Sequence, residues 1–136
     1  MDIVIRYVFM HRATRNLEIK RYSTSQLEER TAQKLSPCFN ESEYELIARN
    51  LFTGLKDKNG VEIYKGDVIK IYDPLDPSMP EYISSVFDYY GAFTVKCAGM
   101  DIYTDYFVIG RLDDYTFEVI GNIYQNPDLI SEEARL

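Results

Sequence analysis

The first part of the chain alternates apolar and polar residues with the period of half-buried β-strands. Residues 3–10 form a mostly apolar run, and residues 17–22 alternate between apolar and polar side chains. Such alternation is typical of strands that bury one face. Because residues 13–16 suit a turn between the two runs, the pattern predicts a β-hairpin.

A short helix is predicted directly after this hairpin. Ser25 and Glu28 have the spacing of a capping box, and the helix is expected to continue to about Lys34. Residues 37–42 are interpreted as a linker. We therefore expect residues 1–42 to form a hairpin-helix unit that serves as an oligomerisation element.

The rest of the chain contains short apolar segments separated by turn residues. Strands are predicted at residues 44–53, 67–72, 82–89, 93–98 and 116–124. The third and fourth of these form a hairpin around Tyr90-Gly91, and Asn126-Pro127 suits the start of a short terminal helix. Many short strands with turn signals between them favour a small barrel.

The sequence therefore predicts a mainly β protein of the α+β type. Its second domain, residues 43–136, is expected to be an SH3-like β-barrel with a short C-terminal helix. The sequence Gly-Asp-Val-Ile at residues 66–69 is similar to the opening strand of such barrels. An OB-type barrel is the alternative that the sequence leaves open.

The densest turn chemistry lies at residues 51–70. Asn59-Gly60 predicts a type I′ hairpin turn, because both residues tolerate a positive φ. The Asp57 carboxylate is expected to accept hydrogen bonds from nearby backbone amides, as Asx turns do. Structural roles are predicted for seven residues: Gly54, Asp57, Asn59, Gly60, Gly66, Asp67 and Gly121.

The same segment resembles the YopX family of small phage and prophage proteins. The matching motifs are TGLKDKNG at residues 53–60, EIY at 62–64, GDVI at 66–69 and EVIGNIYQNPDL at 118–129. The resemblance covers residues 44–130. It implies a β-rich protein with a small barrel, and it brings no catalytic residues because the family is functionally uncharacterised.

Charge is distributed unevenly along the chain, whose formal net charge is −7. Residues 1–50 contain eight Lys or Arg and seven Asp or Glu, whereas residues 51–136 contain seven and fifteen. A net negative chain is a poor non-specific nucleic-acid binder. Because the basic hairpin and the acidic body are complementary, we expect a homo-oligomer, with nucleic-acid binding by the hairpin as the alternative.

The chain contains 12 tyrosines and no tryptophan. Exposed aromatic rings on small barrels stack bases or bind proline-rich peptides, although packing explains most such rings. Partner-binding roles are predicted for seven residues: Arg6, Arg12, Arg15, Arg21, Tyr72, Tyr89 and Tyr90.

Catalytic chemistry is sparse in this sequence. His11 is the only histidine, and Cys38 and Cys97 stand alone, without the spacing of a disulfide framework or a metal site. No phosphate-binding loop, signal peptide or membrane span is recognised. We therefore expect no catalytic residue, no metal and no cofactor.

The predicted function is that of a non-enzymatic interaction module. The expected partner is an unknown host or phage protein, and the expected location is the cytoplasm of a bacterial host cell. A nucleic-acid accessory protein that uses the basic hairpin is the second hypothesis.

Overall fold

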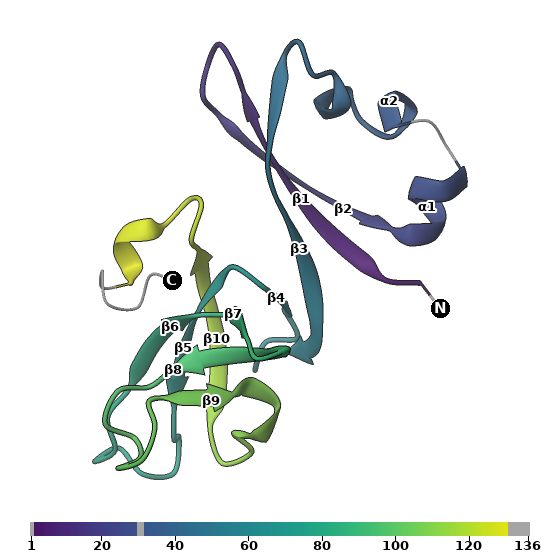
Figure 1. Ribbon diagram of the computed structural model, residues 1–136. Helices are drawn as coiled ribbons and strands as arrows, with labels where there is room; N and C mark the ends of the chain where they lie inside the picture. Colours follow the sequence, from purple (N-terminus) through teal and green to yellow (C-terminus); the bar gives the residue numbers. More distant parts are fainter. Residues whose placement is uncertain (1, 30–31, 131–136) are drawn as a thin grey trace. The chain divides into compact units, whose positions relative to one another are not determined.

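The protein consists of two compact units, Met1–Phe52 and Thr53–Leu136 (Figure 1). The structure is a computed structural model that describes residues 2–29 and 32–130. The division lies later in the chain than the predicted boundary after residue 42. The reason is that β3 (Tyr44–Lys56), expected to belong to the second domain alone, pairs with the N-terminal hairpin over most of its length.

The first unit contains the predicted hairpin, which is confirmed as β1 (Val4–His11) and β2 (Leu17–Ser23). β1 is the central strand, because it pairs antiparallel with β2 on one side and with β3 on the other. The His11 N–H donates to the Asn16 carbonyl at 2.9 Å and closes the predicted turn.

Two short helices, α1 (Thr24–Glu29) and α2 (Ala32–Leu35), follow β2. The predicted capping pair is wrong by two residues. The Ser23 N–H donates to Gln26 Oε1 at 2.8 Å, and the Gln26 N–H donates to Ser23 Oγ at 3.2 Å. α1 starts earlier than expected because these two reciprocal hydrogen bonds cap the helix at Ser23, the last residue of β2.

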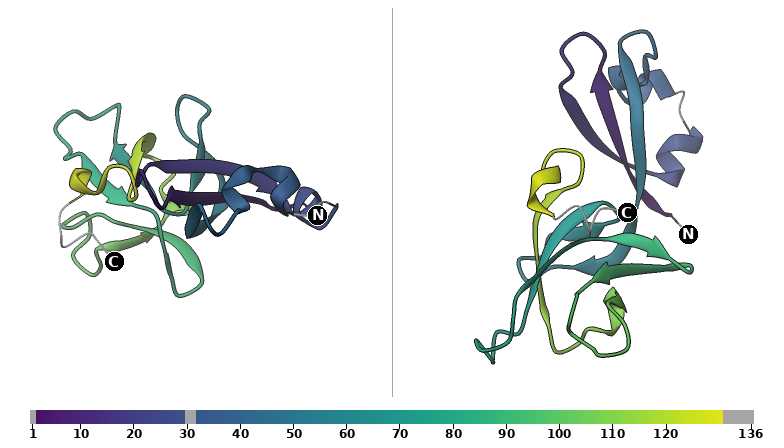
Figure 2. Two further views of the ribbon diagram at one scale, coloured as in Figure 1. Left: turned by 90° about the horizontal axis from the view of Figure 1, so that it is seen from above. Right: turned by 60° about the vertical axis from the view of Figure 1, so that its left-hand side comes forward.

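The helices cover one face of the part of the sheet formed by β2, β1 and β3 (Figures 1 and 2). The 3-10 helix η1 (Pro37–Phe39) is part of this cover rather than a linker, because Cys38 is buried and Phe39 packs in the core. The Phe39 ring lies edge-on to the ring of Phe9, with centroids 5.1 Å apart. The core of the first unit is therefore aromatic, and its members are Tyr7, Phe9, Tyr22, Cys38 and Phe39.

The second unit contains two three-stranded antiparallel sheets, with strand orders β10-β5-β6 and β7-β8-β9. The strands of these two sheets are β5 (Asp67–Tyr72), β6 (Tyr82–Ser85), β7 (Phe87–Tyr89), β8 (Ala92–Lys96), β9 (Tyr106–Val108) and β10 (Thr116–Asn122). The unit also contains β4 (Glu62–Tyr64), which pairs with β3. The 3-10 helices η2 (Ile109–Arg111) and η3 (Pro127–Leu129) complete the unit. The predicted terminal helix is thus a single 3-10 turn in the described residues, and Glu132 and Glu133 lie outside them.

One hydrophobic core serves both sheets of this unit. Its buried members come from β4, β5, β8 and the segments beside them, and they are Ile63, Ile69, Ile71, Val86, Val95, Cys97 and Ile109. The Lys96 N–H donates to the Ser84 hydroxyl at 2.9 Å and links β8 to β6. The mainly β prediction is confirmed, but the strand pairings of the described residues do not close into the predicted SH3-like barrel.

The hairpin at residues 57–61 has a different turn from the predicted type I′. Gly60 has a φ of 80°, whereas Asn59 does not have a positive φ. The Gly60 N–H donates to the Asp57 carbonyl at 3.0 Å, and the Asp57 N–H donates to the Val61 carbonyl at 2.8 Å. This is a type I turn followed by a left-handed glycine, the usual arrangement of a hairpin with a longer loop.

A two-residue hairpin turn with the positive φ angles of type I′ occurs elsewhere in the second unit. Tyr90 and Gly91 have φ angles of 49° and 78°, and Tyr89 pairs with Ala92 across them. A positive φ at both central positions defines the I′ turn. Tyrosine rarely adopts this conformation, so the β7–β8 hairpin holds Tyr90 in an unusual backbone geometry.

Candidate interaction surface

The predicted basic surface of the hairpin is only partly present. Arg6 is buried, with 3% of its surface exposed, and its Nε and Nη2 donate to Asn50 Oδ1 at 3.3 and 3.2 Å. Arg12 donates from Nε to the Glu41 carbonyl at 2.8 Å. Arg15 and Arg21 are exposed. Arg6 therefore acts as a structural residue of the first unit, and the prediction that it binds a partner does not fit its burial.

Tyr72 is held by charged neighbours on the outer side of β5. The ammonium groups of Lys58 and Lys70 lie 5.5 and 5.3 Å from the centre of its ring, and Lys58 donates to the Tyr72 hydroxyl at 3.0 Å. Lys58 also pairs with Glu118 at 3.3 Å, and Lys70 pairs with Glu81 at 3.4 Å. The neighbours of Tyr72 make this part of the surface a charged network rather than an aromatic one.

The Asp57 carboxylate stabilises turns of the second unit by accepting hydrogen bonds from backbone N–H groups. Asp57 Oδ1 accepts from the N–H groups of Asn59 and Val61, and its Oδ2 accepts from the Val119 N–H at 2.9 Å. Burial raises the pKa of Asp57, but these N–H groups together with Lys58 outweigh it and hold the pKa below its ordinary value. The predicted Asx turn is confirmed, and Asp57 also ties the hairpin to β10.

The contacts and backbone angles of Asp67, Gly54, Gly66 and Gly121 are also those of structural residues. Asp67 Oδ2 accepts from the Tyr64 N–H at 2.8 Å, and Gly54 and Gly66 have φ angles of 87° and 90°. A Cβ atom at Gly121 would lie 2.4 Å from the side-chain oxygen of Asn126, so this position has no room for a side chain.

Four aromatic rings gather on the outer face of the β7–β8–β9 sheet, and we call them the aromatic row: Phe87, Tyr89, Tyr90 and Tyr106. Phe87 and Tyr89 are two residues apart on β7 and so point to the same face. Tyr106 is opposite Lys96 in the pairing of β8 with β9, which places it on that face too. The strand register, rather than the sequence order, brings these rings together.

Phe87 is the buried base of the row, with 8% of its surface exposed. Its ring lies edge-on to Tyr89 and Tyr106, at centroid distances of 6.4 and 6.1 Å. Tyr89 is 39% exposed, and Tyr90 at the turn is 93% exposed. The row therefore combines a packed base with tyrosine rings that face solvent.

The pKa of Tyr89 reflects this packing. Burial raises the pKa of the Tyr89 phenol above its ordinary value, and the neighbouring phenols of Tyr90 and Tyr106 raise it further. The Tyr89 hydroxyl thus stays protonated at neutral pH. It offers a hydrogen-bond donor and acceptor beside the apolar rings.

A mostly apolar hollow of about 280 Å³ lies beside the base of the row. Phe87 lines it together with residues between β6 and β7, after β10 and around η3, among them Val86, Ile123, Tyr124, Pro127 and Ile130. Because Phe87 belongs to both features, the hollow adjoins the base of the row in the second unit.

Sequence reasoning found part of this surface. Tyr89 and Tyr90 were predicted as partner-binding residues, whereas Phe87 and Tyr106 were not included. The alternation Phe-Asp-Tyr at residues 87–89 signals that Phe87 and Tyr89 share a face. Tyr72, the third predicted tyrosine, lies on β5 in the other sheet and is not part of the row.

Histidine and cysteine often take part in catalysis, but His11 and Cys97 have the contacts and burial of structural residues. His11 Nδ1 accepts from the N–H groups of Ala13 and Thr14 at 3.2 Å, in the hairpin turn. Burial raises the pKa of the Cys97 thiol to about 12, which leaves the thiol protonated. Within residues 2–29 and 32–130, His, Cys, Asp and Glu side chains form no group of three that could hold a metal ion.

In the part of the chain that the structure describes, no helix has both the length and the apolar character needed to span a bilayer.

The comparisons with known proteins identify the family. Similar solved structures include protein yopX from Bacillus subtilis, which is 19% identical, with 94% of this chain and 98% of that chain covered and a TM-score of 0.50. They also include protein EF1440 from Enterococcus faecalis, which is 25% identical, with 95% of this chain and 79% of that chain covered and a TM-score of 0.42. No curated protein matches the chain. The family model described as YopX protein matches residues 8–131, so the chain belongs to the YopX family.

Proposed function

We propose that this protein is a non-enzymatic protein-interaction module that binds its partner through the aromatic row. The supporting observation is that Tyr89 and Tyr90 expose their rings while the buried ring of Phe87 holds the row in place. Tyrosine is enriched at interfaces because it supplies a large, rigid contact area at a small cost in conformational entropy. The surface is therefore already ordered for binding.

Electrostatics favour a protein partner over nucleic acid at this surface. The row belongs to the acidic part of the chain, where Asp and Glu outnumber Lys and Arg by fifteen to seven in residues 51–136. An acidic surface repels the phosphate backbone that supplies most non-specific affinity for nucleic acid. The alternative, a nucleic-acid accessory protein, relies on the basic hairpin, and the burial of Arg6 reduces the charge available there.

Capture of partners from the lysate of a bacterial host tests this function. Immobilised wild-type protein is expected to retain a protein that a Tyr90→Asn variant loses, even after nuclease treatment of the lysate. Asparagine suits the positive φ of 49° at this position, so the variant removes the ring and keeps the turn. Retention that disappears with nuclease, or that Tyr90→Asn leaves unchanged, would support the nucleic-acid alternative or another surface.

Self-association is the second part of the proposal. The first unit has an exposed apolar set on β3, namely Leu46, Ile47 and Leu51, and within the described residues β2 is an edge strand of its sheet. Edge strands and exposed apolar side chains favour pairing with another chain. The opposite charge balance of residues 1–50 and 51–136 adds complementarity between copies.

Light scattering on the full chain at physiological salt is expected to show a homo-oligomer. The double variant Leu46→Glu with Leu51→Glu, which places charges on the exposed apolar set, is expected to reduce its mass. A wild-type chain that is monomeric at all concentrations measured would contradict this part of the proposal.

The cellular setting and the barrel are also proposals. The resemblance to phage and prophage proteins supports a role in the cytoplasm of a bacterial host, and the two buried free thiols, Cys38 and Cys97, suit a reducing compartment. The common core of the two sheets and the link between Lys96 and Ser84 support an open form of an SH3-like barrel for the second unit.

A further inference from the structure

β2 is a long strand at the edge of its sheet. In the described residues, β2 and β10 are the longest of the strands that end a sheet, with seven residues each. The outer side of β10 is occupied by the hairpin at residues 57–61, because the Val119 N–H donates to Asp57 Oδ2 at 2.9 Å. The Phe117 carbonyl also accepts from the Lys58 N–H at 3.0 Å. β2 has only β1 beside it (Figures 1 and 2).

Alternate residues of β2 direct their backbone groups toward this outer edge. At one end of the strand pair the Asn16 carbonyl accepts from the His11 N–H at 2.9 Å. At the other end the Thr24 N–H donates to the Ile3 carbonyl at 2.9 Å. In an antiparallel pair, residues that bond across it alternate with residues that do not. The register of β1 with β2 therefore turns outward the N–H and C=O groups of Leu17, Ile19 and Arg21.

A helix cap limits the edge at its C-terminal end. By the same alternation the Ser23 N–H also turns outward, where it donates to Gln26 Oε1 at 2.8 Å. A strand that pairs with β2 between its first residue and this cap meets residues 17–21. The middle of that stretch is Ile19.

The two residues that flank Ile19 have opposite charges. Glu18 and Lys20 lie on one face of the sheet because they are two residues apart on a strand. Their carboxylate and ammonium groups are 4.0 Å apart, and their side chains are 46% and 43% exposed. Both charges are therefore accessible beside the outer edge of β2.

We propose that two copies of this protein join through β2, in an antiparallel pair with its two-fold axis at Ile19. This inference rests on the proposed self-association and names the surface that carries it. The two Ile19 residues exchange both main-chain hydrogen bonds and place their side chains against each other. A two-fold contact uses the same surface of both copies, and the sheet of the first unit becomes continuous across them.

The charges select this register over its neighbours. With the axis at Ile19, Glu18 of each copy lies opposite Lys20 of the other. These are non-hydrogen-bonded positions, where side chains across an antiparallel pair approach most closely. An axis at Glu18 or at Lys20 would instead place like charges opposite each other, which destabilises a strand pair. The centre of the edge and the charge pattern thus indicate the same residue.

Charge reversal in the full-length chain tests the pairing. Glu18→Lys and Lys20→Glu each place two like-charge pairs at the contact, and each is expected to weaken self-association about tenfold or more. Light scattering over a range of protein concentrations measures this change. An equimolar mixture of the two variants has opposite charges at both positions, so we expect it to associate within about threefold of the wild type. Circular dichroism of each variant confirms that it is folded.

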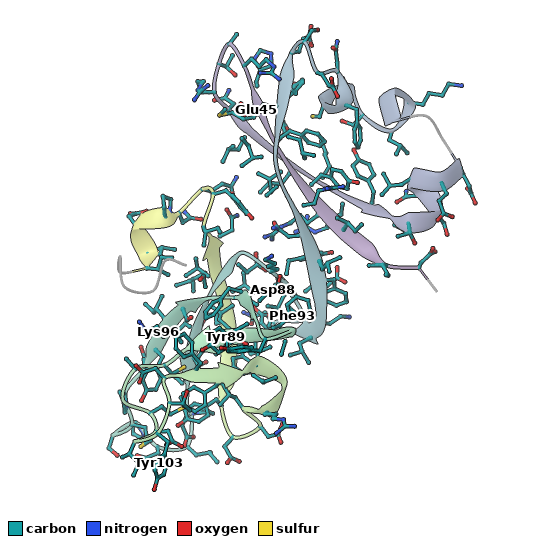
Figure 3. The ribbon with its side chains drawn as sticks, in the orientation of Figure 1. Glu45, Asp88, Tyr89, Phe93, Lys96 and Tyr103 are labelled. Carbon is teal, nitrogen blue, oxygen red and sulfur yellow. The ribbon has the colours of Figure 1, made fainter. Side chains whose placement is uncertain are left out.

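The matched control for Lys20→Glu is Lys96→Glu. It makes the same change of charge at the end of β8, in the second unit (Figure 3). Lys96→Glu is expected to self-associate like the wild type. An equal loss in both variants would mean that net charge, rather than the pairing of β2, controls association.

Cysteine substitution tests the register. Facing residues of a hydrogen-bonded antiparallel pair have Cα atoms about 5.5 Å apart, which is within the range of a disulfide. Ile19→Cys is therefore expected to form a linked dimer under mild oxidation. Leu17→Cys is expected not to, because its two copies would lie about 14 Å apart along the strands. The native thiols, Cys38 and Cys97, are buried and so give a low background.

Three outcomes would overturn the inference: unchanged self-association in both charge variants, no recovery in their mixture, or cross-linking of Leu17→Cys instead of Ile19→Cys. A monomeric wild type would overturn it together with the proposed self-association. If the wild type is an oligomer that Leu46→Glu with Leu51→Glu dissociates and the charge variants do not, self-association stands and only the pairing through β2 is wrong.

Discussion

Replacing Asp57 with alanine is expected to lower the free energy of unfolding of the second unit by about 3 kcal/mol or more. The carboxylate is only 8% exposed and accepts from three backbone N–H groups, those of Asn59, Val61 and Val119, at 2.8, 2.9 and 2.9 Å. An N–H that loses its partner in a buried position costs about 1–3 kcal/mol. Urea denaturation followed by circular dichroism measures the change.

Asp73→Ala is the matched control for this substitution. Asp73 also forms an Asx turn, in which its carboxylate accepts from the Leu75 N–H at 2.9 Å in an exposed loop. Its loss is expected to cost less than about 1 kcal/mol, because water replaces the bond. Equal effects of the two substitutions would mean that Asp57 only shapes a local turn and does not tie the hairpin to β10.

The same site gives a pH dependence with a definite sign. The pKa of Asp57 is lower in the folded protein than its ordinary value of 3.8, so its contribution is complete above the unfolded pKa. It is lost as the pH falls through the folded pKa, because the unfolded chain binds the proton more readily. The difference in stability between wild type and Asp57→Asn is therefore expected to be constant at neutral pH and to narrow below about pH 4.

The sequence predicted local features well and long-range ones poorly. The N-terminal hairpin, the Asx turn of Asp57 and the hairpin around Tyr90-Gly91 depend on neighbouring residues, and all three are present. The turn at Asn59-Gly60 is not the predicted type I′, because the hydrogen bond from the Asp57 N–H to the Val61 carbonyl makes the loop longer than two residues. A dipeptide indicates that a positive φ is tolerated, but strand pairing decides which residues adopt it.

The residues predicted to bind a partner show the same limit of local sequence patterns. Arg6 was counted with the basic surface, yet it lies opposite Asn50 in the pairing of β1 with β3, where the two side chains bond. Alternation along β1 places Arg6 and Tyr7 on opposite faces, but it does not reveal which strand covers Arg6. Similarly, Tyr106 joins Tyr89 only through the register of β7, β8 and β9, which no local pattern specifies.

Substitution of Phe9 by alanine is expected to lower the stability of the first unit by about 3–5 kcal/mol. Phe9 is 2% exposed, and its ring packs on Tyr7 at 5.9 Å and on Phe39 at 5.1 Å between centroids. The substitution removes the ring that joins the sheet to η1, and the small core has few groups that could fill the space. The aromatic contacts are lost in addition to the buried area.

Hydrogen exchange with mass spectrometry locates this effect within the chain. Because each unit has its own core, Phe9→Ala is expected to accelerate exchange in peptides from β1 and β2 and to leave those from β5 and β8 protected. Ile3→Ala is the control, since Ile3 directly precedes β1 of the same sheet but is 48% exposed, and its loss is expected to cost less than about 1 kcal/mol. Equal acceleration in both units would show that they unfold as one cooperative body, and the first unit could then not act as a separate oligomerisation element.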